Sequence, residues 1–190
     1  TEVGFDPGLL GNRAYLYDVS DPNFQIAGAL SRSAYPGKVT NYRKTLAAVS
    51  GGGQLAYVLD LFEVTGGSQQ DYLLLGPLAE GGYIRPEVGG NLIPVPQGLL
   101  NEGVVFTKPH GQNDRIPPDA AFGFYQNVKA LSAETPPVLD IGQGRVSVRA
   151  WLTADDGGTI YLADVPSVRA AKESEAAVWE HWAPMMAWRK

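Results

Sequence analysis

Apolar and polar residues alternate over short stretches along most of this chain. A period of two, interrupted by Gly, Pro, Asn or Asp, is typical of β-strands joined by turns. It predicts strands at residues 13–19, 24–30, 39–49, 55–64, 72–75, 104–107, 122–131, 138–141, 145–153, 159–164 and 185–188. The chain is therefore predicted to be all-β: an antiparallel β-sandwich of two large sheets, with long loops and at most one short helix near the C-terminus.

Residues 55–76 are the most strand-like part of the pattern. An apolar run at 55–64 is followed by a turn at Gly66 and Gly67 and by a second run at 72–75, which predicts a hairpin. A run as apolar as 55–64 is expected to be covered on both faces and to lie at the centre of a sheet. Asp60 interrupts this run, so its carboxylate must reach a sheet edge, a partner or a site.

Two further turns carry their own signals. The sequence SGGG at 50–53 predicts a hairpin between the strands at 39–49 and 55–64. The sequence DDGG at 155–158 predicts a tight turn that pairs strand 145–153 with strand 159–164. A metal-binding interpretation of its two aspartates is disfavoured because no third ligand has a suitable spacing. Strand 145–153 alternates cleanly, with Val146, Val148, Ala150 and Leu152 on one face and Arg145, Ser147, Arg149 and Trp151 on the other.

Long Gly- and Pro-rich stretches separate the strands. Residues 77–103 and 108–120 are predicted loops, which would either carry a binding surface or simply cover a face of a sheet. Residues 169–182 have the only helix-like composition and would form either a short helix or a loop.

Length and composition narrow the function classes. A chain of 190 residues is expected to form a single domain over 1–190. It contains no cysteine, but the absence of cysteine says little about the compartment of the protein. A net charge of −5, with scattered basic residues, argues against a nucleic-acid partner or an anionic membrane. No apolar run approaches the length of a membrane span, and no signal-peptide pattern opens the chain. The sequence starts at Thr1 and not at Met, as expected of a processed or excised form.

Candidate catalytic residues are few. The chain has no thiol nucleophile and no serine elbow, and its two histidines are His110 and His181. His110 lies close in sequence to Asp114 and Asp119, so these three residues are candidates for a ligand or acid-base site, with a solvated loop histidine as the alternative. We predict no metal site and no cofactor, since a zinc site would need carboxylates gathered from across the fold.

Two blocks of the sequence resemble a known family. The segments AYPGKVTNYRKTLAAV (34–49) and AYVLDLFEVTGGSQQDYLLLG (56–76) resemble the C-terminal β-sandwich domain of the heparinase II/III-like polysaccharide lyases. The matching residues are Tyr42, Arg43, Lys44, Thr45, Leu46, Tyr57, Asp60, Phe62, Gly66, Gly67, Asp71, Tyr72 and Gly76. The resemblance continues more loosely through FGFYQNVKAL, RVSVRAWL and the terminal MMAWRK.

This resemblance implies a bacterial, secreted or periplasmic protein related to enzymes that cleave uronic-acid polysaccharides by β-elimination. In the family, the catalytic residues lie mainly on an (α/α) toroid upstream of the sandwich, and the sandwich carries a zinc site. Gly11, Gln70 and Leu75 stand where the family has histidines, so the resemblance carries over no catalytic or metal residue.

The expected function is therefore that of a non-catalytic domain, whose partner is a polysaccharide or the upstream toroid. A free-standing carbohydrate-binding or protein-interaction module, using loops 77–103 and 108–120, is the alternative. Aromatic rings side by side on an open face would favour glycan binding, whereas a broad aliphatic patch would favour docking to another domain. An enzyme with an active site around His110, Asp114 and Asp119 is a third hypothesis.

Overall fold

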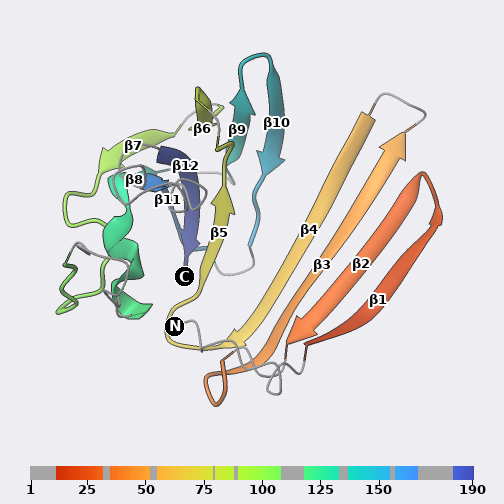
Figure 1. Cartoon of the computed structure of the whole chain (residues 1–190), viewed down its shortest axis with the longest axis horizontal. Coiled ribbons are helices and arrows are strands. Elements are labelled where there is room, and N and C mark those ends of the chain that lie inside the picture. The colour runs from red at the N-terminus through yellow and green to blue at the C-terminus, as the bar shows by residue number, and fades with distance from the viewer. Residues whose placement is uncertain are drawn as a thin grey trace, which may run out of the picture. The chain divides into compact units, whose positions relative to one another are not determined.

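The computed structural model describes residues 12–31, 35–51, 55–78, 80–87, 90–107, 118–132, 137–154, 157–166 and 182–190. Its elements are β1 (Asn12–Asp21), β2 (Phe24–Ser31), β3 (Val39–Gly51), β4 (Leu55–Gly66), β5 (Asp71–Leu75), β6 (Gly82–Pro86), β7 (Asn91–Pro94), the 3-10 helix η1 (Pro118–Phe124), β8 (Gln126–Ser132), β9 (Val138–Gln143), β10 (Val146–Trp151), β11 (Thr159–Pro166) and β12 (Trp182–Arg189). Every strand pair is antiparallel, which confirms the predicted all-β fold; the strands form three sheets rather than two (Figure 1).

Contacts divide the chain into two compact units, residues 1–68 and residues 69–190. We call them the N-terminal unit and the C-terminal unit and describe each by itself. The single domain that the sequence predicts over residues 1–190 stays a prediction. Within the described residues, no helix is both long enough and apolar enough to cross a bilayer.

The N-terminal unit contains one four-stranded meander with the strand order β1-β2-β3-β4. The turn at 20–23 joins β1 to β2, and β3 pairs with β4 over their full lengths, from Val39 opposite Gly66 to Gly51 opposite Leu55. The hairpin predicted from SGGG is thus confirmed. These strands are long because their apolar alternation continues without an internal proline.

Two predictions for residues 55–76 were wrong. β4 is the edge strand of its sheet, not the centre, and it pairs with β3, whereas β5 pairs with β12 in the C-terminal unit. The physical reason is register, because β4 pairs with β3 and β5 pairs with β12 along their whole lengths, so neither run needs the other as a partner. Tyr57 and Val58, in the first third of β4, are 61% and 65% exposed, so this run is not covered on both faces.

A bulge in β1 shapes one face of this sheet. The register with β2 shifts between Ala14 and Leu16, and the ring of Tyr15 lies over Gly28, where an added Cβ would come within 2.6 Å of the ring. The hydroxyl of Tyr15 shares a hydrogen bond with that of buried Thr45 on β3. Gly28 is therefore required for the ring to cross β2 and reach β3.

The C-terminal unit is a two-sheet sandwich. Its five-stranded sheet has the order β5-β12-β11-β8-β7, and its three-stranded sheet has the order β10-β9-β6. Both sheets contribute to one core. Its buried members are Leu131, Leu139, Ile160, Leu162 and Met186, and Ile84, Ile141, Ala150 and Leu152 pack against them.

The other face of the five-stranded sheet is also covered. Val128, Ala163 and Ala187 form a second buried cluster with Leu99, and Phe122 of η1 packs on it. The central strand β11 is therefore apolar on both faces, as expected for a strand between two layers.

Three predicted strand assignments in this unit need correction. The predicted loop 77–103 contains β6 and β7, whose prolines, Pro86 and Pro94, stand at strand ends where a missing N–H does least harm. The predicted strand at 104–107 does not form. The predicted strand 122–131 is divided between η1 and β8.

The predicted hairpin between 145–153 and 159–164 was also wrong. β10 pairs with β9, whereas β11 pairs with β8 and β12. The physical reason is that β10 carries a polar face that needs solvent, while β11 is apolar on both faces and is most stable at the sheet centre. Asp155 and Asp156 lie outside the described residues, as does the predicted helix at 169–182 except for Trp182, which begins β12.

Candidate functional site

The hairpin residues singled out from the sequence are distributed between the two units. Asp60 lies on β4 and forms an ion pair with Lys44 of β3 at 2.9 Å, so its carboxylate is explained by a structural partner. Gly66 and Gly67 have φ angles of 102° and 81°, and Gly67 donates its N–H to the carbonyl of Lys38. Both glycines are therefore explained by the left-handed backbone conformation that the turn requires.

Asp71 and Tyr72 belong to β5 in the C-terminal unit. Asp71 forms an ion pair with Arg189 at 2.7 Å, and the two side chains are only 13% and 17% exposed. Arg189 also donates to the carbonyl of Leu99 at 2.9 Å and stacks over the ring of Phe122, while Tyr72 lies opposite Trp188. This cluster ties the last strand to the rest of its unit, so its role is structural.

The loop site predicted at His110, Asp114 and Asp119 stays a prediction. His110 and Asp114 lie outside the described residues, and Asp119 falls in η1 with its side chain outside them. Among the described residues, no group of three His, Asp or Glu side chains could hold a metal ion.

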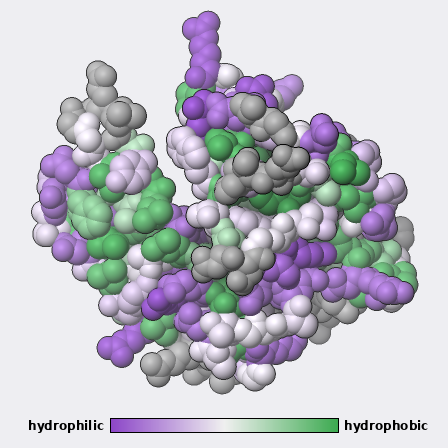
Figure 2. Space-filling view, turned by 180° about the vertical axis from the view of Figure 1, so that it is seen from behind, coloured by the Kyte–Doolittle hydropathy of each residue, from purple (hydrophilic) through white to green (hydrophobic). Residues whose placement is uncertain are grey.

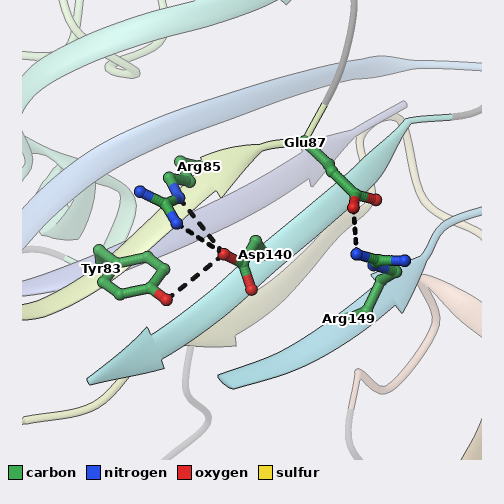
Figure 3. Close-up of polar contacts among 5 residues, drawn as sticks. All are labelled: Tyr83, Arg85, Glu87, Asp140 and Arg149. Carbon is green, nitrogen blue, oxygen red and sulfur yellow. Dashed lines mark hydrogen bonds and ion pairs between the residues drawn. The ribbon is translucent and has the colours of Figure 1, made fainter. Parts of the chain in front are cut away.

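A polar constellation of five residues lies on the outer face of the three-stranded sheet, and the sequence analysis missed most of it. Figure 3 shows Asp140 of β9 accepting hydrogen bonds from Arg85 and Tyr83 of β6. The Arg85 Nη2 atom is 2.9 Å from the Asp140 Oδ2 atom, and the Tyr83 hydroxyl is 3.3 Å from the same oxygen. The guanidinium of Arg85 also lies 4.5 Å from the centre of the Tyr83 ring, so one aromatic ring and one cation frame the carboxylate.

Gly142 makes this arrangement possible. A Cβ at this position of β9 would lie 2.7 Å from both the Tyr83 hydroxyl and the Cβ of Ser147. The absence of a side chain thus lets Tyr83 and Ser147 approach Asp140 from the two neighbouring strands. A larger residue at 142 would push both of them away from the carboxylate.

The electrostatics of the cluster keep Asp140 charged. Hydrogen bonds from Arg85, then from Ser147 and Tyr83, lower the pKa of Asp140 below its ordinary value, although partial desolvation opposes them. The same carboxylate raises the pKa of Arg85. Asp140 therefore stays ionised near neutral pH and accepts hydrogen bonds, which suits binding better than proton transfer.

A second ion pair lies next to the first on the same face. Arg149 of β10 pairs with Glu87, which follows β6 (Figure 3). Trp151, two residues beyond Arg149 and thus on the same face, is 70% exposed. The predicted face with Ser147, Arg149 and Trp151 is confirmed, since Ala150 and Leu152 pack into the core instead.

A signal for the missed residues was present in the sequence. Tyr83, Arg85 and Glu87 alternate with Ile84 at a period of two, and Asp140 stands between Leu139 and Ile141. The prolines and glycines of 77–103 hid this alternation by indicating a loop. The missed site therefore follows directly from the missed strand β6.

A shallow hollow forms elsewhere in the C-terminal unit. It has a volume of about 530 Å³ and lies between Pro94–Gly98 and the start of β8. Asn127 has a φ of 52° there, at a bulge in the pairing of β8 with β11, and donates to Asp164 at 2.7 Å. Part of the predicted contact loop 77–103 thus lines a concave surface, in which the side chains of Asn127 and Asp164 bind each other.

The N-terminal unit has an exposed apolar surface instead. Strand register places nine large apolar side chains on one face of its sheet, which we call the Leu59 face: Tyr15, Leu16, Phe24, Ile26, Leu30, Val49, Tyr57, Leu59 and Leu61. Leu59 and Leu61 are each about half exposed. Figure 2 shows green, apolar surface interspersed with purple, polar surface over the N-terminal unit.

No protein-family model and no curated protein matches this chain.

Proposed function

We propose that this chain is a non-catalytic β-domain of a bacterial, secreted or periplasmic polysaccharide lyase, and that its Leu59 face docks an (α/α) toroid. The residue matches in 34–49 and 56–76 support the family, and the docking role rests on one observation. The Leu59 face exposes a group of apolar side chains beside the Arg43–Glu63 ion pair, and an exposed apolar patch bordered by polar residues is the arrangement expected of an interaction surface. Six of its nine side chains are aliphatic, and Val49 of β3 lies between Phe24 and Tyr57 in the strand register, which favours a protein partner over a glycan.

The isolated chain lacks a suitable set of groups for β-elimination among its described residues. β-Elimination needs a base for the proton α to the carboxyl group and a group that neutralises the carboxylate. Asp140, the best-defined carboxylate on a polar face, is held ionised by three donors and is poorly suited to that base role. We therefore expect the isolated chain to be inactive, and the whole lyase to act on uronic-acid polysaccharides.

The first test measures the unsaturated uronate that elimination produces. The chain is incubated with heparan sulfate, chondroitin and alginate, and the ultraviolet absorbance of the product is followed. A flat trace is expected. A rising trace would show that the chain is itself a lyase and would contradict the scaffold proposal.

The second test addresses docking. The chain is co-expressed with the toroid of a heparinase II/III-like lyase, and complex formation is followed by size-exclusion chromatography. Leu59→Ser with Leu61→Ser is expected to abolish co-elution. The matched control is Val146→Ser with Val148→Ser, two exposed apolar residues of the C-terminal unit. Equal effects of the two pairs would contradict docking through the Leu59 face.

A second candidate function is a free-standing carbohydrate-binding module. The observation that favours it is the outer face of the three-stranded sheet, where two ion pairs accompany an exposed tryptophan. Exposed aromatic rings beside fixed donors and acceptors are suited to sugar rings and their hydroxyls. This candidate does not exclude docking, because it uses a different sheet.

A further inference from the structure

The outer face of the three-stranded sheet is a regular grid of side chains. Its first row contains Ser147, Gly142 and Tyr83; its second contains Arg149, Asp140 and Arg85; its third contains Trp151, Val138 and Glu87. Strand spacing makes the grid about 10 Å wide, and the rise per residue makes it about 13 Å long. An area of this size matches a small ligand that lies flat, not a deep pocket.

The charges on this grid are balanced. Arg85 is paired with Asp140 and Arg149 with Glu87, so the face combines two cations and two anions. The four groups still offer many hydrogen-bond donors and acceptors at fixed positions, because each ion pair holds its partner in place. Hydroxyl groups, which both donate and accept, are complementary to such a face, whereas a carboxylate or sulfate would meet cations that are already neutralised.

Trp151 adds an apolar contact at one end of the grid. Its large ring is 70% exposed although Ala150 and Leu152, its neighbours, pack on the core. Exposed tryptophan is concentrated at binding surfaces, because it supplies a large contact area at a small entropic cost. The Tyr83 ring at the opposite corner is already stacked by Arg85, so Trp151 is the ring of this grid with an open surface.

We propose that this face binds a neutral saccharide: Trp151 stacks on one pyranose ring, and the Arg149–Glu87 and Arg85–Asp140 pairs bind the hydroxyls of that ring and its neighbour. The site deepens the second candidate function above and rests on it. It is independent of the Leu59 face. The hollow beside Asn127 is a weaker candidate, because its aromatic residue, Tyr125, is packed against the core and its Asn127 and Asp164 bind each other.

Calorimetric titration of the 190-residue chain tests this proposal. The probes are neutral β-1,4-linked hexamers of glucose, mannose and xylose, with an alginate hexamer as the charged counterpart. At least one neutral hexamer is expected to bind, and Trp151→Ala is expected to weaken its Kd about tenfold or more. Tyr17→Ala, a similarly exposed aromatic residue on the four-stranded sheet, is the matched control and is expected to leave the Kd unchanged.

Amide chemical-shift changes locate the ligand independently of any variant. The largest shifts are expected in β9 and β10, and Arg149→Gln is expected to weaken the Kd severalfold while the thermal midpoint stays near that of the wild type. Binding with equal Kd in Trp151→Ala and Tyr17→Ala would overturn this site while leaving the carbohydrate-binding function in place. Binding of the alginate hexamer alone would overturn the neutral class, and binding of no hexamer would overturn both the site and that function.

Discussion

Strands β4 and β11 show how differently one kind of sequence is used in the two units. Both are largely apolar runs interrupted by carboxylates, Asp60 and Glu63 in β4 and Asp164 in β11. β11 is buried on both faces, whereas Tyr57, Val58, Leu59 and Leu61 of β4 are about half exposed or more. The difference is the second layer, since the described buried clusters both belong to the C-terminal unit. Apolar pattern thus predicts a strand, but burial depends on whether another layer reaches it.

The strongest expected contrast concerns leucine packing. Leu139→Ala removes a fully buried side chain between the two sheets of the C-terminal unit and is expected to lower the free energy of unfolding by about 4 kcal/mol. Leu59→Ala on the exposed face is expected to cost less than about 1 kcal/mol, because little area is removed from contact. Urea denaturation measures both. Equal losses would mean that the Leu59 face is covered in solution, for example by a second copy of the chain.

The ion pairs offer the next contrast. Arg189→Met leaves the carboxylate of Asp71 buried without its partner and is expected to cost about 3 kcal/mol. Arg149→Met breaks a far more exposed pair with Glu87 and should change the free energy of unfolding by less than about 1 kcal/mol. Urea denaturation again serves as the measurement. The double variant Arg189→Met with Asp71→Leu should regain much of the loss, and failure to do so would show that Arg189 stabilises mainly through Leu99 and Phe122.

Local pattern predicted most strands of this fold but few of their partners. The alternation at 24–30, 39–49 and 138–141 placed β2, β3 and β9 within two residues of their ends. Pairing failed for β5 and for β10, because the choice among antiparallel partners depends on long-range packing that a period of two does not encode. The outer-face grid was missed because the prolines and glycines of 77–103 hid strand β6, and its residues Tyr83 and Asp140 are also 57 residues apart in sequence.

Tyr125 provides a pH-dependent contrast of smaller size. Burial, with the charge of Asp71 as a second cause, raises its pKa to about 12. Since the unfolded phenol ionises near its ordinary value of 10, the folded chain holds an extra proton between pH 10 and 12 and loses stability as the pH rises through that window. The loss is on the order of 1 kcal/mol after allowance for partial exposure.

Tyr125→Phe is expected to remove this part of the alkaline loss. Thermal midpoints of wild type and variant are compared at pH 9 to 12, and Tyr57→Phe in the N-terminal unit is the matched control for the loss of an exposed phenol. An alkaline slope identical in wild type and Tyr125→Phe would mean that Tyr125 is solvated in the folded chain.

The smallest expected effect is a change in the pKa of a single carboxyl group, which compares the polar face with the N-terminal unit. Glu63 in the N-terminal unit and Asp140 in the C-terminal unit both have a pKa lowered mainly by a hydrogen bond from one arginine, Arg43 or Arg85. Asp140 has two further donors, Ser147 and Tyr83. Arg43→Gln should therefore remove most of the pKa depression of Glu63, whereas Arg85→Gln should remove only part of that of Asp140.

Carbon-13 NMR titration of the two carboxyl groups measures this difference directly. The depressed pKa means that each folded carboxylate stabilises its unit above the ordinary pKa and loses that contribution as the pH falls through the lowered value. Tyr83→Phe and Ser147→Ala should each raise the pKa of Asp140 by less than Arg85→Gln does, because neither removes a charge. If Arg85→Gln alone returned Asp140 to its ordinary pKa, the two hydroxyls would be turned away from the carboxylate in solution and free to bind a ligand themselves.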